Sequence, residues 1–104
     1  VLGVWQVSPR ELEELLRQVE GVSDVAVVGV PNPRMGEAPR AYVVPKPSAH
    51  LSPSYMQQFI AERVAAHKQL AGGVQLVDSL PRSQSGKVLK RKLRDDFCAT
   101  HSKL

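Results

Sequence analysis

The sequence predicts a small α+β domain in which a short three-stranded sheet is covered by about three helices. Two observations predict this class. Three segments repeat apolar residues at the spacing of one helix face, and three short segments are rich in β-branched apolar residues, as buried strands are. Their order is that of an antiparallel hairpin plus one strand joined through a helix. We expect one domain over residues 1–104, with a flexible tail from 99 to 104.

The first helix is predicted to begin after Ser8, because Ser8-Pro9-Arg10-Glu11 is a capping box with proline at the first helical position. Its inward face repeats apolar side chains at helical spacing, at Leu12, Leu15, Leu16 and Val19. Gly21 is expected to end the helix, because glycine readily adopts the left-handed conformation found there.

The first two strands are predicted at residues 25–30 and 40–44, antiparallel to each other, because both runs are apolar and rich in valine. Residues 31–36 are expected to form a turn or loop, since prolines cannot donate the amide hydrogen bonds of a strand interior. Residues 46–51, which contain proline and serine, are expected to form a second loop.

The second half of the chain is predicted to add two helices and a strand. Ser52-Pro53 begins a helix by the same capping logic, and its inward residues are Met56, Phe59, Ile60 and Val64. Gly72-Gly73 interrupts the chain before a short strand at 74–77. A polar loop at 83–87 then precedes a last helix over about 88–98, with an apolar face formed by Leu89, Leu93 and Phe97.

The composition, with 42% apolar residues, is that of an ordinary soluble globular protein. The single cysteine, Cys98, excludes an internal disulfide and suits a reducing compartment. The three histidines show no metal-ligand spacing, no run approaches the ~20 apolar residues of a membrane span, and no signal peptide is visible. Because the chain starts at Val1 within an apolar stretch, we expect it to be a piece of a longer protein.

The last three residues, Ser102-Lys103-Leu104, match the C-terminal tripeptide that directs proteins to peroxisomes. We therefore expect a peroxisomal protein, a natural C-terminus and an import receptor as partner. The alternative is that three common residues stand there by chance.

Gly86-Lys87 is the most informative pair, because it stands in a polar loop directly before a basic helix. The ammonium group of Lys87 is thereby placed where it can be held out to phosphate or carboxylate oxygens on another surface. No glycine-rich run precedes the pair and no Ser or Thr follows it, so it is not a nucleotide P-loop. Without a nucleophile–base pair or paired carboxylates nearby, these residues look like one half of a site.

The net charge is +4, and five basic residues lie between Lys87 and Arg94 with no acidic residue among them. Such a run is typical of a solvated helix face, but it also fits an anionic cofactor or nucleic acid. A small basic nucleic-acid-binding module is therefore an alternative. The low aromatic content of 5% and the lack of a stacking pair beside the run count against it.

These motifs resemble the small C-terminal domain of the adenylate-forming enzymes, which include acyl-CoA synthetases, coumarate–CoA ligases and beetle luciferases. The resemblance extends over nearly the whole chain, with the motifs in the family's order. They are residues 3–13, residues 25–31 with Gly36-Glu37, residues 68–74, residues 77–81 and residues 81–93.

The resemblance implies an ATP-dependent acid–CoA ligase. A carboxylic acid and ATP with Mg²⁺ would form an acyl-adenylate and pyrophosphate, and the acyl group would then pass to the thiol of coenzyme A. It implies that Lys87 reaches the α-phosphate and the acid in the first step, with Ser85, Gly86 and Gln6 beside the nucleotide. Gly86 would give the loop freedom to bring Lys87 in. A large N-terminal domain of the same chain would hold the ATP and acid pockets, so this lid domain is expected to be inert alone and to hold no metal.

The resemblance also implies that the domain rotates before the second step and then presents other residues to the coenzyme A tunnel. The candidates are Gly3, Trp5, Gly72 and Gly73. The first loop departs from the family's pattern, because Val4 stands between Gly3 and Trp5. The remaining alternative is the lid of a luciferase-like oxygenase, since light emission uses the same first step.

Overall fold

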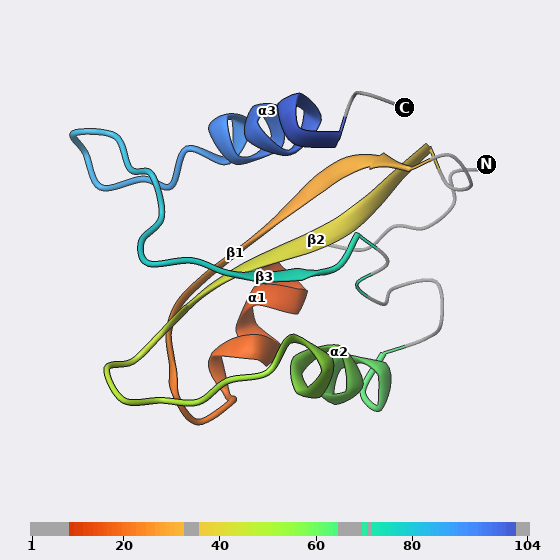
Figure 1. Cartoon of the computed structure of the whole chain (residues 1–104), viewed down its shortest axis with the longest axis vertical. Helices are drawn as coiled ribbons and strands as arrows, with labels where there is room; N and C mark the ends of the chain where they lie inside the picture. The colour runs from red at the N-terminus through yellow and green to blue at the C-terminus, as the bar shows by residue number, and fades with distance from the viewer. Residues whose placement is uncertain (1–8, 33–35, 65–69, 71, 102–104) are drawn as a thin grey trace.

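The protein folds as a mixed three-stranded sheet between two layers of helices (Figure 1), which confirms the predicted fold class. The structure is a computed structural model, and it describes residues 9–32, 36–64, 70 and 72–101. Its elements are α1 (Pro9–Arg17), β1 (Val22–Asn32), β2 (Gly36–Pro45), α2 (Pro53–Ala61), β3 (Val74–Leu76) and α3 (Lys90–His101). The strand order is β1-β2-β3, in which β2 is antiparallel to β1 and parallel to β3.

Helices cover both faces of the sheet, α1 and α2 on one side and α3 on the other (Figure 1). Side chains of a strand point alternately to its two faces, so each strand contributes to two apolar clusters. Val25 and Val27 pack with the leucines of α1 and with Met56 and Ile60 of α2. The intervening residues of β1 pack with Tyr42 and with Leu93 of α3. Burial on both faces explains why β1 reads as a continuous apolar run.

The helices on the first face use the residues that the sequence indicates. Leu12 and Leu16 of α1 are fully buried, and Gly21 adopts a positive φ of 97° shortly after the helix ends. The cap of α1 at Ser8 lies outside the described residues. Ser52 caps α2, because its side chain accepts a hydrogen bond from the Tyr55 amide at 3.4 Å.

The hairpin is longer than predicted, and the expectation that residues 31 and 32 lie in a loop is wrong. Pro31 and Asn32 continue β1, where Pro31 is opposite Glu37 of β2. Proline is tolerated here because β1 is an edge strand, so its missing amide hydrogen is not needed by a neighbour on the outer side. Gly36 opens β2 with a positive φ of 80°.

The last helix begins and ends later than predicted. It starts at Lys90 because the two preceding residues pair with the chain before the lysine loop. Val88 forms a β-bridge with Arg82, and the Leu89 amide donates to the Pro81 carbonyl. Leu89 is therefore 40% exposed instead of forming part of the buried helix face. At the other end α3 continues to His101, so residues 99–101 are helical where we expected a tail.

Candidate functional site

The candidate lysine loop is a tight β-hairpin whose ends are Arg82 and Val88. The Ser83 amide donates to the Lys87 carbonyl at 2.9 Å, and the Gly86 amide donates to the Ser83 carbonyl at 2.9 Å. Gly86 has a φ of 88°, so the loop is a turn followed by one left-handed residue. Nothing lies within 4 Å of the place a side chain on Gly86 would take. Glycine is thus favoured here by backbone conformation. That it also gives the loop freedom to bring Lys87 in stays a prediction.

Two serine hydroxyls brace this turn. The Oγ atoms of Ser83 and Ser85 lie 2.9 Å apart, and the Lys87 amide donates to Ser83 Oγ at 3.3 Å. The sequence pointed to Ser85 as a polar neighbour of the lysine, whereas Ser83 was missed. The tendency of serine to bond to nearby backbone in turns is the signal that could have indicated Ser83.

The Lys87 side chain is exposed, although its backbone is held at both its amide and its carbonyl. Within the part of the chain that the structure describes, its ammonium group makes no ion pair. All three of its N–H donors are therefore available to an external acceptor. Such a group can meet an anion on another surface without first breaking a contact in its own domain.

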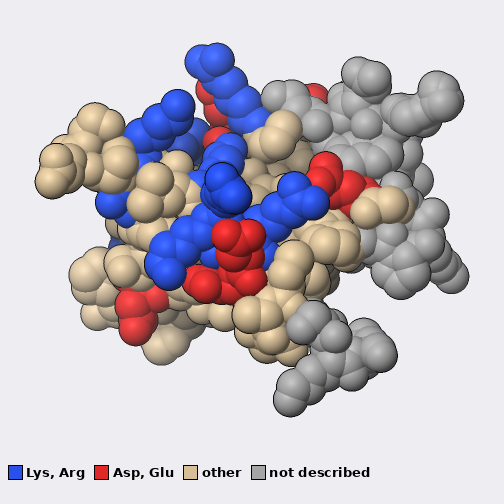
Figure 2. Space-filling view, turned by 90° about the horizontal axis from the view of Figure 1, so that it is seen from above, with Lys and Arg blue, Asp and Glu red and all other residues tan. Residues whose placement is uncertain are grey.

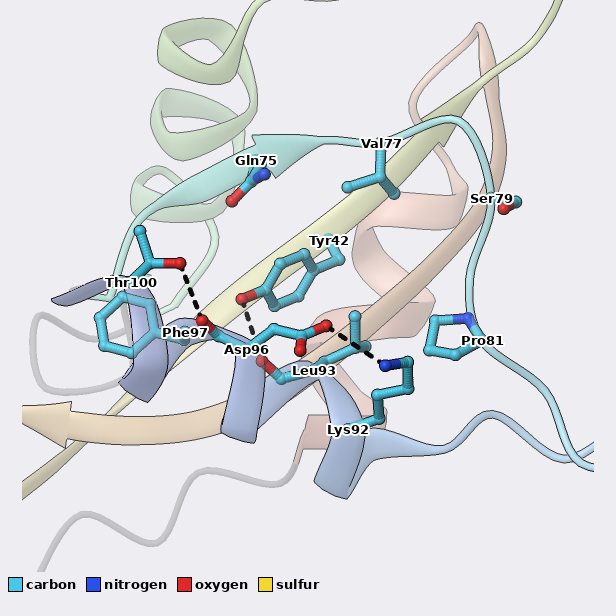
Figure 3. A pocket seen from close by; sticks show the side chains of 10 residues that line it. All are labelled: Tyr42, Gln75, Val77, Ser79, Pro81, Lys92, Leu93, Asp96, Phe97 and Thr100. Atoms are coloured by element: carbon cyan, nitrogen blue, oxygen red, sulfur yellow. Dashed lines mark hydrogen bonds and ion pairs between the residues drawn. The ribbon is translucent and has the colours of Figure 1, made fainter. Parts of the chain in front are cut away.

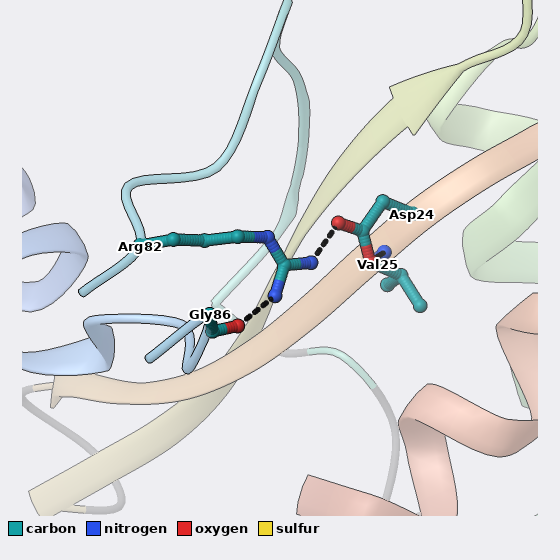
Figure 4. Close-up of polar contacts among 4 residues, drawn as sticks. All are labelled: Asp24, Val25, Arg82 and Gly86. Carbon is teal, nitrogen blue, oxygen red and sulfur yellow. Dashed lines mark hydrogen bonds and ion pairs between the residues drawn. The ribbon is translucent and has the colours of Figure 1, made fainter. Parts of the chain in front are cut away.

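Arg82 fastens the hairpin to the sheet (Figure 4). Its Nη1 donates to the Gly86 carbonyl at 2.6 Å, and its Nη2 donates to Oδ2 of Asp24 on β1. The other oxygen of Asp24 accepts the Val25 amide at 2.9 Å, next to the irregularity where β1 shifts register against β2. Sequence reasoning missed this pair because its members are 58 residues apart.

Gly72 and Gly73 form the turn into β3, and a side chain would be unfavourable at either position. A side chain on Gly72 would come within 2.8 Å of the Pro39 carbonyl oxygen, to which the Gly72 amide also donates at 2.8 Å. Gly73 has a φ of 97°, and its carbonyl accepts the Ala41 amide at 3.0 Å. These contacts begin the pairing of β3 with β2. Contact of either glycine with coenzyme A stays a prediction.

Arg40 links the glycine turn to α3, a role that no pattern in the sequence indicated. Its guanidinium lies 5.2 Å from the centre of the Tyr42 ring and 4.9 Å from that of Phe97. It also donates to the Gly72 carbonyl at 2.8 Å and to Oε1 of Gln75 at 2.6 Å. Cationic stacking and hydrogen bonding together hold the start of β3 against the helix.

A groove of about 420 Å³ lies beside this stack (Figure 3). One wall is β3 and the segment that follows it, and the other wall is α3. Two of its polar side chains are hydrogen-bonded to backbone carbonyls of α3. The Tyr42 hydroxyl donates to the Leu93 carbonyl at 3.5 Å, and the Thr100 hydroxyl donates to the Asp96 carbonyl at 2.9 Å. The described residues that line the groove include no nucleophile beside a base, so the groove offers shape and apolar surface but no evident chemistry.

The structure does not bring all the predicted site residues together. The lysine hairpin and the Gly72-Gly73 turn lie toward opposite ends of the molecule, with β3 between them (Figure 1). Gly3, Trp5 and Gln6 lie outside the described residues, as do residues 102–104. The described part of the site therefore consists of two separate places on the domain surface.

The basic run before and within α3 is a charged face with acidic partners. Figure 2 shows Lys and Arg gathered on this side of the molecule, with Asp and Glu among them. Among the described residues, three ion pairs involve the run: Lys90 with Glu13 at 2.8 Å, Arg94 with Glu37 at 3.4 Å, and Lys92 with Asp96 at 3.9 Å. Pairing within the domain favours a solvated helix face over a nucleic-acid interface.

Among residues 9–32, 36–64, 70 and 72–101, no three His, Cys, Asp or Glu side chains are grouped so that they could hold a metal ion. No helix in these ranges has the length and apolar character needed to cross a membrane.

Comparison with known proteins identifies relatives over most of the chain. The sequence profile of the AMP-binding enzyme C-terminal domain matches residues 11–87. The chain is 48% identical over 92 residues to a putative acyl-coenzyme A synthetase of Emericella nidulans, covering 86% of this chain and 17% of that protein. It is 47% identical over 92 residues to a phenylacetyl-CoA ligase of Aspergillus niger, covering 88% of this chain and 17% of that protein.

A similar domain also occurs in solved structures. The ATP-bound form of MatB from Rhodopseudomonas palustris matches 91% of this chain with a TM-score of 0.86 and 33% sequence identity, over 19% of its own length. The chain thus spans less than a fifth of each of these three proteins.

Proposed function

The chain belongs to the family of AMP-binding enzyme C-terminal domains, and from this premise we propose that it serves an AMP-forming acyl-CoA ligase in which Lys87 promotes adenylate formation. In the first step a carboxylate oxygen of the acid attacks the α-phosphorus of ATP. The bond from this phosphorus to pyrophosphate breaks, and pyrophosphate leaves with the electron pair. In the second step the coenzyme A sulfur, after losing its proton, attacks the acyl carbon and AMP leaves.

The observation that carries this proposal is the exposed ammonium group of Lys87, which forms no ion pair with any residue that the structure describes. A carboxylate and a triphosphate are both anionic, so their approach is unfavourable unless a cation lies between them. An ammonium group beside the transferring phosphoryl oxygens stabilises the charge that develops there. Lys87 fits this task because the hairpin holds its backbone, while its ammonium group is not paired with any described residue of the domain.

The partners of this domain follow from the same proposal. ATP with Mg²⁺, a carboxylic acid and coenzyme A are the proposed substrates, held mainly by a large N-terminal domain of the same chain. The names of the relatives, which are an acyl-coenzyme A synthetase and a phenylacetyl-CoA ligase, support the acid–thiol chemistry, and the ATP-bound neighbour supports the nucleotide.

The separation of the two candidate places supports a rotation between the steps. The lysine hairpin and the Gly72-Gly73 turn lie toward opposite ends of the domain, with β3 between them (Figure 1). Two such places on one rigid body cannot meet the same reaction centre in a single orientation. Their successive use therefore requires that the domain turn on its partner after the adenylate has formed.

We also propose that the Ser102-Lys103-Leu104 tripeptide is read by the peroxisomal import receptor. This proposal rests on the identity and position of these three residues in the sequence. It places the ligase in an organelle, and it is independent of the role of Lys87.

The proposed function is tested by separating the two half-reactions in the full-length enzyme. We expect Lys87→Ala to lower the rate of acyl-adenylate formation by about 10²–10³-fold, the loss typical of a removed charge-stabilising group. Thioester formation from a supplied acyl-adenylate should be unchanged. Lys46→Ala is the matched control, because Lys46 is also an exposed loop lysine but lies on the connection between β2 and α2. Equal losses in both half-reactions would contradict the role of Lys87.

A further inference from the structure

We propose that Arg82 and Asp24 are positioning residues for Lys87, because their ion pair fixes the direction in which the lysine hairpin stands on the sheet. The inference rests on the adenylation role proposed for Lys87 and adds two residues to the same step. Neither residue is placed against a substrate. Both act through the backbone that carries the lysine.

The internal hydrogen bonds of the hairpin fix its shape but not its direction. They join Ser83 to Gly86 and Lys87, all within the loop itself. The tip of the hairpin is exposed, and apart from the two residues next to Gly86 no described residue lies within 4 Å of the position that a Gly86 side chain would occupy. Apolar packing holds the chain on either side of the hairpin, at the buried Leu80 and Leu93. The tip itself therefore needs another attachment.

Arg82 supplies this attachment because one guanidinium reaches both the tip and the sheet (Figure 4). Nη1 holds the Gly86 carbonyl, one residue before Lys87, and Nη2 holds the Asp24 carboxylate. The planar fork of arginine suits two acceptors at a fixed separation, whereas the single ammonium of a lysine does not reproduce that geometry. The Gly86 carbonyl, and with it the start of Lys87, is thereby tied to β1.

Asp24 is a firm anchor for the arginine. Its side chain is 27% exposed, and its second oxygen is occupied by the Val25 amide, which restricts rotation of the carboxylate. Asp24 also stands at the irregularity in the pairing of β1 with β2. Irregularities of this kind re-aim a side chain relative to a regular strand.

The direction of the hairpin matters because Lys87 has to arrive at a reaction centre on another domain. A displacement of about 1 Å in a reacting group can lower a rate by about 10²-fold. An ion pair as exposed as this one contributes little to overall stability. Loss of the pair is therefore expected to appear in the rate of adenylation before it appears in the folding of the domain.

The test uses the full-length enzyme with Arg82→Met, Arg82→Lys and Asp24→Asn. We expect Arg82→Met to lower the kcat of adenylation by about 10–100-fold, with the KM for ATP and the thioester half-reaction unchanged. Arg82→Lys should recover part of the loss, and Asp24→Asn should give an intermediate loss. Arg94→Met is the matched control, because Arg94 also joins a carboxylate on another element, Glu37 at 3.4 Å, and this ion pair does not involve the hairpin.

A second readout separates positioning from an independent effect. In a Lys87→Ala background, Arg82→Met should cause no further loss of adenylation, because the arginine acts through the missing lysine. Amide hydrogen exchange across residues 83–87 should become faster in Arg82→Met and stay unchanged in Arg94→Met.

Each contrary result has a distinct meaning. Normal adenylation in Arg82→Met, together with a large loss in Lys87→Ala, would overturn the positioning role and leave the proposed function intact. Additive losses in the double variant, or equal losses in both half-reactions, would also overturn it. Normal adenylation in Lys87→Ala would refute the proposed function, and the positioning role with it.

Discussion

Replacing Glu13 of α1 by alanine is expected to destabilise the domain by about 1.5–4 kcal/mol. Glu13 is a buried charged residue, and its Oε2 accepts the Val27 amide at 2.8 Å and pairs with the Lys90 ammonium at 2.8 Å. The Ala41 amide donates to the Gly73 carbonyl, away from β1. Val27 lies opposite Ala41, and in an antiparallel pair such residues either bond to each other or both point away, so the Val27 amide points away from β2, at the edge of the sheet. Glu13 thus satisfies an amide that neither β2 nor β3 can reach.

The expected magnitude is the sum of two unequal parts. Val27 is fully buried, so loss of its charged acceptor leaves an unsatisfied amide, at a cost of about 1.5–3 kcal/mol. The Lys90 side chain is 44% exposed, so the ion pair adds at most about 1 kcal/mol after solvent screening. Glu13→Gln keeps an acceptor for Val27 and gives up only the ion pair. We therefore expect it to cost about 1 kcal/mol or less.

Urea denaturation followed by circular dichroism measures these differences, with Glu14→Ala as the control. Glu14 lies next in the same helix, but its side chain is 63% exposed and its partner Arg10 is 3.7 Å away, so its loss should cost no more than about 0.5 kcal/mol. A Glu13→Ala variant as stable as Glu14→Ala would refute the reasoning. Equal losses for the Gln and Ala variants would show that the ion pair, and not the amide, carries the effect.

Three further outcomes are expected. Gly86→Ala and Gly36→Ala should each lower the free energy of unfolding in urea by about 1 kcal/mol, because both glycines have a positive φ and open surroundings. Only Gly86→Ala should also slow adenylation in the full-length enzyme. Gly72→Ala should cost more, about 1–3 kcal/mol, because the added carbon meets the Pro39 carbonyl at 2.8 Å; a stability equal to that of Gly86→Ala would argue against this. In cells, deletion of Leu104 from a fluorescent fusion should abolish peroxisomal localisation, and an unchanged punctate distribution would exclude the tripeptide as the signal.

The parts of the fold that the sequence predicts are those determined by neighbouring residues. The apolar spacing of α1, the Ser52 cap of α2 and the left-handed Gly21 all depend on a few adjacent positions. The strand ends and the start of α3 depend on pairing partners instead. Pro31 joins β1 because Glu37 lies opposite it, and Val88 leaves the helix because Arg82 pairs with it.

The candidate site shows the same division. Lys87 could be singled out because the residues that define its turn are its neighbours. Its anchor could not, because Asp24 and Arg82 meet only after β1 and the chain beyond β3 have come together. Arg40 was missed for the same reason, since Gly72 and Phe97 are distant in the sequence.

The two-sided burial of the sheet has a consequence for biosynthesis. Ala26, Val28 and Val30 of β1, together with Tyr42 of β2, gain their cover from α3, which the ribosome makes after every strand. A nascent chain that has emerged only as far as β3 would display this apolar surface to the cytosol. We infer that a pause of translation in this interval, or a truncation before Lys90, would leave this surface exposed. The polypeptide would then bind chaperones and tend to aggregate.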